Sequence, residues 1–93
     1  MSDDGKIYKG QPLLMELDTE IDCSEATSIK MKLQIGGAII GCFDAALKAG
    51  STSIIKYQFV VGEINAKGLG EWWACVDSMP GVPYKEHIYE EGE

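Results

Sequence analysis

The sequence contains no arginine. All eight basic residues are lysines, against fifteen acidic residues, so the formal net charge is −7. Nucleic-acid-binding proteins use arginine and a basic face to neutralise phosphates and to read bases. An acidic chain is also repelled by anionic membranes, and no apolar run approaches the roughly 20 residues of a spanning helix. The composition therefore argues against nucleic-acid and membrane partners.

Histidine and cysteine are also scarce. There is one histidine, His87, and the three cysteines (Cys23, Cys42 and Cys75) form no CxxC pair. Because disulfide frameworks need an even cysteine count and zinc sites need closely spaced ligands, we expect three reduced thiols. A Cys42–Cys75 bridge is the alternative. The acidic segment 18–25 lacks the glycine and terminal glutamate of an EF-hand loop, so we expect a solvated loop there.

Motifs for catalysis and nucleotide binding are missing as well. There is no GxSxG sequence, and the Gly68-Leu69-Gly70 segment lacks the second half of a P-loop or a dinucleotide fingerprint. No serine or cysteine has a neighbourhood typical of a nucleophile. We therefore expect no catalytic residue, no cofactor and no metal, and we predict that the chain is not an enzyme.

Length and termini point to a single small domain. Ninety-three residues leave no room for a second core, so we predict one domain, 1–93, with flexible acidic termini at 1–5 and 90–93. A secretory signal begins with basic residues followed by an apolar run, whereas residues 1–5 read MSDDG. We expect the protein in the cytoplasm of a host cell or in a virion.

The sequence is rich in period-two alternation of apolar and polar residues, which is typical of half-buried strands. The segments with strand character are 12–18, 28–35, 53–61, 70–77 and 84–89. Gly36-Gly37 predicts a tight hairpin turn after the second of them. Six or seven short strands joined by turns predict a sandwich or a small barrel.

Three other segments are less regular. Segment 43–50 fits either an extended strand or a short helix closed by glycine. Segment 63–68 fits a single helical turn or a loop, and Pro80-Gly81 fits the centre of a type II turn. The apolar faces of the strands predict much of the core: Ile29, Met31, Leu33, Ile35, Tyr57, Phe59, Trp72, Ala74 and Val76.

The Trp72-Trp73 pair carries the most information about a functional surface. Adjacent strand residues point to opposite faces, so only one of the two tryptophans can fill the core from this strand. Trp72 shares its face with Ala74 and Val76, and we expect it inside. Trp73 is then either covered by another element or exposed as an aromatic anchor for a partner.

The order of several short motifs resembles a phage protein family. These motifs are IYKGQ at 7–11, DCSEAT at 22–27, IIKY at 54–57 and GEW at 70–72. Together they are similar to the immunoglobulin-like N-terminal domain of tailed-phage baseplate upper proteins and related small phage structural proteins. The resemblance covers about residues 6–89. It implies an all-β, immunoglobulin-like antiparallel β-sandwich of about seven strands that serves as an assembly piece without catalytic residues.

These observations predict a non-catalytic structural protein, a component of a phage or prophage tail or baseplate, that acts through protein partners or self-association. The expected partner-binding residues are Trp73, Tyr84 and Lys56. We expect the contact on the weakly charged Trp73–Cys75 face and on strand 53–61. The alternative function is a small ligand-binding module, of carbohydrate type, in which Trp73 and Tyr84 form a stacking platform.

Overall fold

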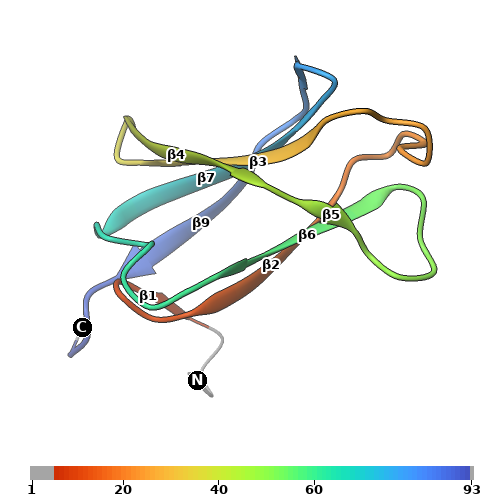
Figure 1. Cartoon of the computed structure of the whole chain (residues 1–93). Helices are drawn as coiled ribbons and strands as arrows, with labels where there is room; N and C mark the ends of the chain where they lie inside the picture. Colours follow the sequence, from red (N-terminus) through yellow and green to blue (C-terminus); the bar gives the residue numbers. More distant parts are fainter. Residues whose placement is uncertain (1–5, 93) are drawn as a thin grey trace.

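The alternating segments form strands in the computed structural model, which describes residues 6–92 (Figure 1). No helix lies within that range, so none there is long enough to cross a membrane. The strands are β1 (Ile7–Tyr8), β2 (Leu13–Asp18), β3 (Ile29–Ile35), β4 (Ala38–Asp44), β5 (Ala46–Leu47), β6 (Ile54–Phe59), β7 (Gly68–Val76), β8 (Met79–Pro80) and β9 (Tyr84–Tyr89).

Within the described residues the strands form two sheets that lie face to face (Figure 1). The larger sheet has the order β1-β9-β7-β3-β4, with β8 paired to the end of β7, and the smaller has the order β2-β6-β5. All pairs are antiparallel except β1 and β9, which are parallel. The prediction of an all-β sandwich is confirmed.

The β3–β4 hairpin forms where the sequence predicted it. Gly36 and Gly37 both have positive φ angles, 59° and 90°, which glycine adopts without steric cost. The chain then stays extended to Leu47 and turns at 49–50, so the helical alternative for segment 43–50 is wrong. Its backbone groups bond outward to neighbouring strands instead of along a helix: the N–H of Ala45 donates to the carbonyl of Ile29 and that of Lys48 to Ile54.

The turn predicted at Pro80-Gly81 is wrong in position. The chain reverses at Asp77 and Ser78, which both have positive φ angles, 51° and 69°. Met79 and Pro80 pair with the end of β7 as β8. Two positive φ angles match the twist of a two-residue hairpin, and aspartate is one of the few residues other than glycine that tolerates them.

The Asp77 carboxylate fixes this turn to the start of β3. One of its oxygens accepts hydrogen bonds from the Thr27 N–H at 2.9 Å, the Thr27 hydroxyl at 2.8 Å and the Ser28 N–H at 2.9 Å. The Asp77 N–H donates to the Ser28 carbonyl at 2.8 Å. The bonds from Thr27 and Ser28 favour the charged form and lower the pKa of Asp77 below its usual 3.8.

A lowered pKa makes the stabilisation by Asp77 dependent on pH. Its contribution is complete above about pH 3.8, the ordinary value, and is lost as the pH falls through the lower folded pKa. We expect wild type to have a higher thermal midpoint than Asp77→Asn at pH 6, and the difference to shrink as the pH is lowered below 3.8. Thermal unfolding followed by circular dichroism measures both midpoints. A difference that stays constant across this range would show that the carboxylate charge plays no part.

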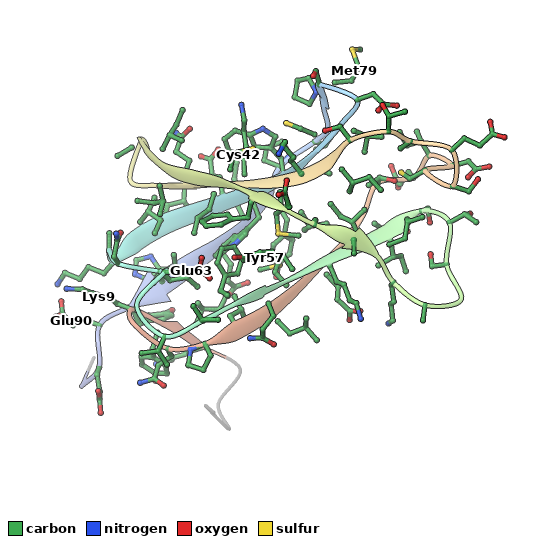
Figure 2. The ribbon with its side chains drawn as sticks, viewed as in Figure 1. Lys9, Cys42, Tyr57, Glu63, Met79 and Glu90 are labelled. Atoms are coloured by element: carbon green, nitrogen blue, oxygen red, sulfur yellow. The ribbon has the colours of Figure 1, made fainter. Side chains whose placement is uncertain are left out.

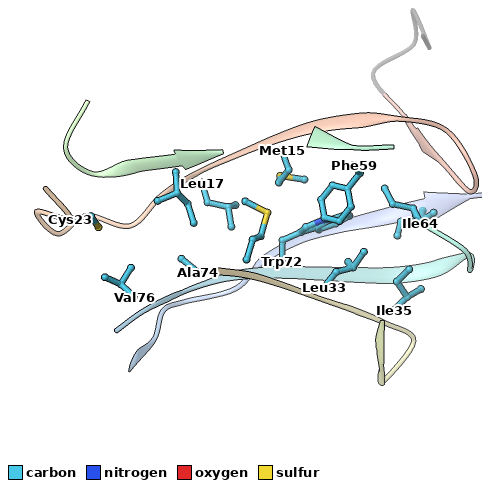
Figure 3. Close-up of a cluster of buried hydrophobic side chains, with 13 residues drawn as sticks. Met15, Leu17, Cys23, Leu33, Ile35, Phe59, Ile64, Trp72, Ala74 and Val76 are labelled. Atoms are coloured by element: carbon cyan, nitrogen blue, oxygen red, sulfur yellow. The ribbon is translucent and has the colours of Figure 1, made fainter. Parts of the chain in front are cut away.

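The space between the sheets is filled by one apolar cluster (Figure 3). Seven of the nine predicted core residues are buried in it, whereas Ile29 and Tyr57 are only partly buried at its margin. The buried residues that the predicted core omitted are Met15, Leu17, Cys23, Ile55, Ile64 and Ile88.

Trp72 lies at the centre of this cluster and is fully buried. Its ring lies over Gly70, two residues earlier on the same strand face. A Cβ atom at position 70 would be 2.7 Å from Cη2 of Trp72 and 2.8 Å from Cδ1 of Ile88. Glycine is therefore required at position 70 by the packing of the tryptophan and not by backbone conformation.

Polar side-chain contacts stabilise the part of the sandwich that lies away from the β7–β8 hairpin (Figure 2). The Tyr57 hydroxyl donates to the Glu63 carboxylate, with an oxygen distance of 3.0 Å, and partial burial together with this bond raises the pKa of Tyr57. Glu90 lies between Lys9 and Lys67, at 3.8 and 3.7 Å. The flexibility expected of 90–93 stays a prediction, and residues 1–5 and 93 lie outside the described residues.

Candidate functional site

A groove opens between the two sheets at the end where β2 finishes and the β7–β8 hairpin begins. Its volume is about 470 Å³. One wall is the second half of β2 with the loop that follows, residues 16–21, and the other is formed by the end of β7, by β8 and by residues 81–84. The hairpin at Asp77 holds the second wall in place, and the Gly81 N–H fastens it further by donating to the Ala74 carbonyl at 2.8 Å.

The rim of the groove exposes large apolar side chains. Val82 is 91% exposed, Met79 72%, Ile21 53% and Tyr84 48%. Figure 2 shows the Met79 side chain extending away from the tip of the hairpin. Exposed apolar patches with polar surroundings mark interaction sites in soluble proteins.

The charged residues that line this groove are all acidic: Glu16, Asp18 and Glu20. Glu16 forms an ion pair with Lys48 at 3.1 Å. The Asp18 carboxylate accepts a hydrogen bond from the Glu20 N–H at 2.9 Å. Within residues 6–92, neither the Asp18 carboxylate nor the Glu20 carboxylate takes part in an ion pair. The groove therefore has a negative rim along β2.

Tyr84 adds a polar contact at the other wall. Its hydroxyl donates to the Glu86 carboxylate at 2.9 Å. This hydrogen bond is the larger cause, and partial burial the smaller one, of a pKa of Tyr84 that is raised above its usual 10, so the hydroxyl keeps its proton at neutral pH. The tyrosine therefore presents an apolar ring, with its hydroxyl already engaged.

The edge of β2 beside the groove carries unpaired backbone groups. In the described part of the chain β2 pairs with β6 alone. Just beyond the last pair, the Thr19 N–H donates to the Ser53 carbonyl at 2.9 Å. Backbone groups of successive residues alternate between the two edges of a strand, so those of Leu14, Glu16 and Asp18 point away from β6. The groove thus borders a sheet edge that can accept another strand.

The structure does not bring the three predicted partner-binding residues together. Trp73 pairs in register with Lys32 on the outer face of the larger sheet and is half-buried. Tyr84 pairs with Trp72, which places it on the inner face, beside the groove. Lys56 is exposed on β6, in the smaller sheet. Because Trp73 and Tyr84 belong to opposite faces of one sheet, they form no common stacking platform.

The Trp73–Cys75 face is also less open than expected. Cys75 is buried, flanked in register by Lys30 on one side and Pro80 on the other. β8, which the sequence did not predict, pairs with β7 at Cys75 and Val76 and so covers the edge of β7 there. Trp73 remains half-buried beside its register partner Lys32, whereas the most exposed apolar residues, such as Val82 and Val61, lie elsewhere.

The cysteines do not form a site. All three are free: Cys23 and Cys75 are buried and Cys42 is exposed. Cys42 and Cys75 lie on β4 and β7, the two neighbours of β3, and strands two apart in a sheet are separated by roughly 9–10 Å, beyond the reach of a disulfide. Among residues 6–92, no three histidine, cysteine or acidic side chains gather in a way that would hold a metal ion.

Sequence reasoning missed the groove because its walls come from residues 16–21 and 74–84, which no local pattern connects. Ile21, Met79 and Val82 lie outside the alternating segments, and these three apolar residues without a predicted buried face were the available signal. Searches against protein-family models, curated proteins and solved structures find no match to this chain.

Proposed function

We propose that the chain is a non-catalytic assembly protein, a component of a phage or prophage tail or baseplate, that acts through protein–protein contacts. It resides in the host cytoplasm and then in the virion. The observation that carries this proposal is the groove, because an exposed apolar rim on a domain this small is costly unless a partner covers it.

The strand order supports the immunoglobulin-like form of this proposal. In immunoglobulin sandwiches the second, fifth and fourth strands lie side by side in one sheet, and the third, sixth and seventh in the other. The order β2-β6-β5 in the smaller sheet and β9-β7-β3 in the larger one is similar. Such sandwiches serve many functions, so the argument for assembly rests on the surface and not on the fold.

The groove also favours protein partners over a carbohydrate. Stacking of a sugar needs an open aromatic face, and the two aromatic residues expected to supply it lie on opposite faces of the sheet. Beside the single Tyr84 ring, the groove offers aliphatic side chains and a strand edge, which suit a polypeptide.

Particle composition tests the proposal. Phage or prophage particles from the strain that encodes the chain should contain it at a fixed ratio to their tail proteins after density-gradient purification. Quantitative mass spectrometry gives the ratio. Absence from particles, with the chain abundant in the same lysate, would contradict the proposal.

A pair of variants shows whether the groove makes the contact. Val82→Asp places a charge at the rim, and we expect its incorporation to fall at least about tenfold, since a desolvated charge costs several kcal/mol. Val61→Asp is the matched control, because Val61 is 76% exposed at the other end of the sandwich and does not line the groove. Equal incorporation of the two variants would assign the contact to another surface.

A further inference from the structure

We infer that the groove receives an extended segment of a partner protein that adds to the free edge of β2 as a fourth strand of the smaller sheet. This inference rests on the proposed function, because it names the kind of segment that an assembly partner supplies. The segment alternates apolar side chains, which enter the groove, with polar ones that include lysine or arginine.

The backbone of β2 defines the length and form of the occupant. The N–H and C=O groups that point away from β6 belong to Leu14, Glu16 and Asp18, that is, to every second residue. A strand that pairs with this edge has its own N–H and C=O groups at the same spacing and can hydrogen-bond to them. β2 has six residues, so it accommodates a partner strand of about the same number, roughly 20 Å long. β1, the segment that precedes β2, does not fill the position, because it pairs with β9 in the other sheet.

The side chains beside this edge define the alternation. A strand next to β2 directs every second side chain toward the space between the sheets, where it meets Leu17, Ala74 and Val76. These residues are apolar, belong to the buried core and line the groove. Val82 and Met79 line the other wall and are largely exposed, so they offer further apolar surface at the rim.

The charges select a basic segment. The other side chains of the added strand lie beside Glu16 and Asp18 on the outer face, and opposite charges across neighbouring strands are favourable. Glu16 already pairs with Lys48, whereas Asp18 and Glu20 have no ion-pair partner among residues 6–92, and no basic residue lines the groove. A second copy of this chain is a poor occupant because it carries a net charge of −7.

One segment of the chain provides a probe of the required chemistry. Residues 29–35, IKMKLQI, alternate apolar side chains with two lysines and a glutamine. In the folded chain this segment is β3, which is paired on both sides by β7 and β4, so it is not itself available for the groove. A fluorescent peptide of this sequence with soluble Gly-Ser flanks can be titrated with the full-length protein, and its anisotropy measures binding.

We expect saturable binding that weakens as salt rises, because the ionic part is screened. The acidic peptide, with glutamate in place of both lysines, should bind at least about tenfold more weakly. Glu16→Pro removes the central N–H of the free edge and should weaken binding at least about tenfold, since the ladder bond from this N–H is lost at the middle of the added strand. Glu16→Ala keeps the N–H and loses only the carboxylate with its surface ion pair to Lys48, so it should weaken binding less than about fivefold.

Modified peptides keep the test independent of whether Glu16→Pro folds. In two further versions of the basic peptide, alternate backbone amides carry an N-methyl group. One version is methylated at the odd-numbered residues of 29–35 and the other at the even-numbered residues. Only one set of amides faces β2, so one peptide should lose binding and the other should retain it. Circular dichroism of Glu16→Pro shows whether its own result can be used.

The outcomes separate this inference from the proposed function. Equal binding of the two methylated peptides, or no binding of the basic peptide, would overturn strand addition even if particles contain the chain. A third outcome is that the basic peptide does not bind, that wild type forms a dimer in sedimentation, and that Glu16→Pro abolishes this dimer. That outcome would overturn the inference and assign the edge of β2 to a second copy of the chain. Selective binding with absence from particles would retain strand addition and refute the tail or baseplate role.

Discussion

Trp72→Ala is expected to abolish or nearly abolish folding, whereas Trp73→Ala is expected to remain folded. Trp72 is fully buried at the centre of the core, and truncation of a buried tryptophan typically costs about 3–5 kcal/mol. That is a large share of the free energy of unfolding of a domain of this size, which is roughly 5–8 kcal/mol. Trp73 is half-buried on the outer face, so its removal leaves no central cavity. Urea denaturation followed by circular dichroism gives both free energies of unfolding.

A third variant separates loss of volume from loss of the indole. Trp72→Phe keeps an aromatic ring in the core and removes Nε1, which has no hydrogen-bond partner among residues 6–92. We expect it to be clearly more stable than Trp72→Ala. If Trp73→Ala proved the more damaging change, the register of β7 would be displaced by one residue, since a one-residue shift exchanges the two faces.

Gly70→Ala is expected to destabilise the protein by about 1–3 kcal/mol, the usual cost of overpacking. At an ordinary strand position the same change would stabilise, because glycine weakens strands. Here the added Cβ would lie 2.7 Å from the Trp72 ring and 2.8 Å from Cδ1 of Ile88, so at least one of these two fully buried side chains must shift within the packed core. The sign of the change in unfolding free energy, measured in urea, therefore tests the packing directly.

Gly81→Ala is the matched control for this substitution. A Cβ atom at Gly81 would meet the Ala74 carbonyl oxygen at 3.5 Å, an ordinary contact, and the N–H that bonds to that oxygen is kept. We expect a change within about 0.5 kcal/mol. A stabilising effect of Gly70→Ala would mean that the Trp72 ring does not lie over the glycine.

Alternation along single segments was sufficient to predict most strands. Met31, Leu33 and Ile35 are buried as the pattern required, because one face of β3 can pack only against the other sheet. The same alternation distinguished Trp72 from Trp73. These predictions succeeded because each depends on residues that are neighbours in sequence.

The features that failed depend on contacts between distant residues. Pro80-Gly81 has the composition of a turn, but Asp77 bonds to Thr27 and Ser28, fifty and forty-nine positions away, and this fixes the reversal earlier. The registers of β7 with β3 and β9, which separate Trp73 from Tyr84, are likewise set by pairing and not by composition. No pattern within one segment contains this information.

The groove illustrates the same limit for the functional site. Its β2 wall was predicted as a half-buried strand, but which edge of that strand is free follows only from the sheet order. The acidic segment 18–25 was expected to be a solvated loop, and in the structure its first residues form the negative rim of an apolar groove. Charge and hydrophobicity were visible separately in the sequence, and the fold places them side by side.

Amide hydrogen exchange along β2 tests the central claim most directly. In the free protein the amides of Leu14, Glu16 and Asp18 should exchange rapidly, and those of Met15 and Leu17, bonded to β6, slowly. Addition of the basic peptide should protect the first three and leave the other two unchanged. Uniform exchange along the strand, or peptide binding without new protection at Glu16, would contradict the assignment of this edge as the binding site.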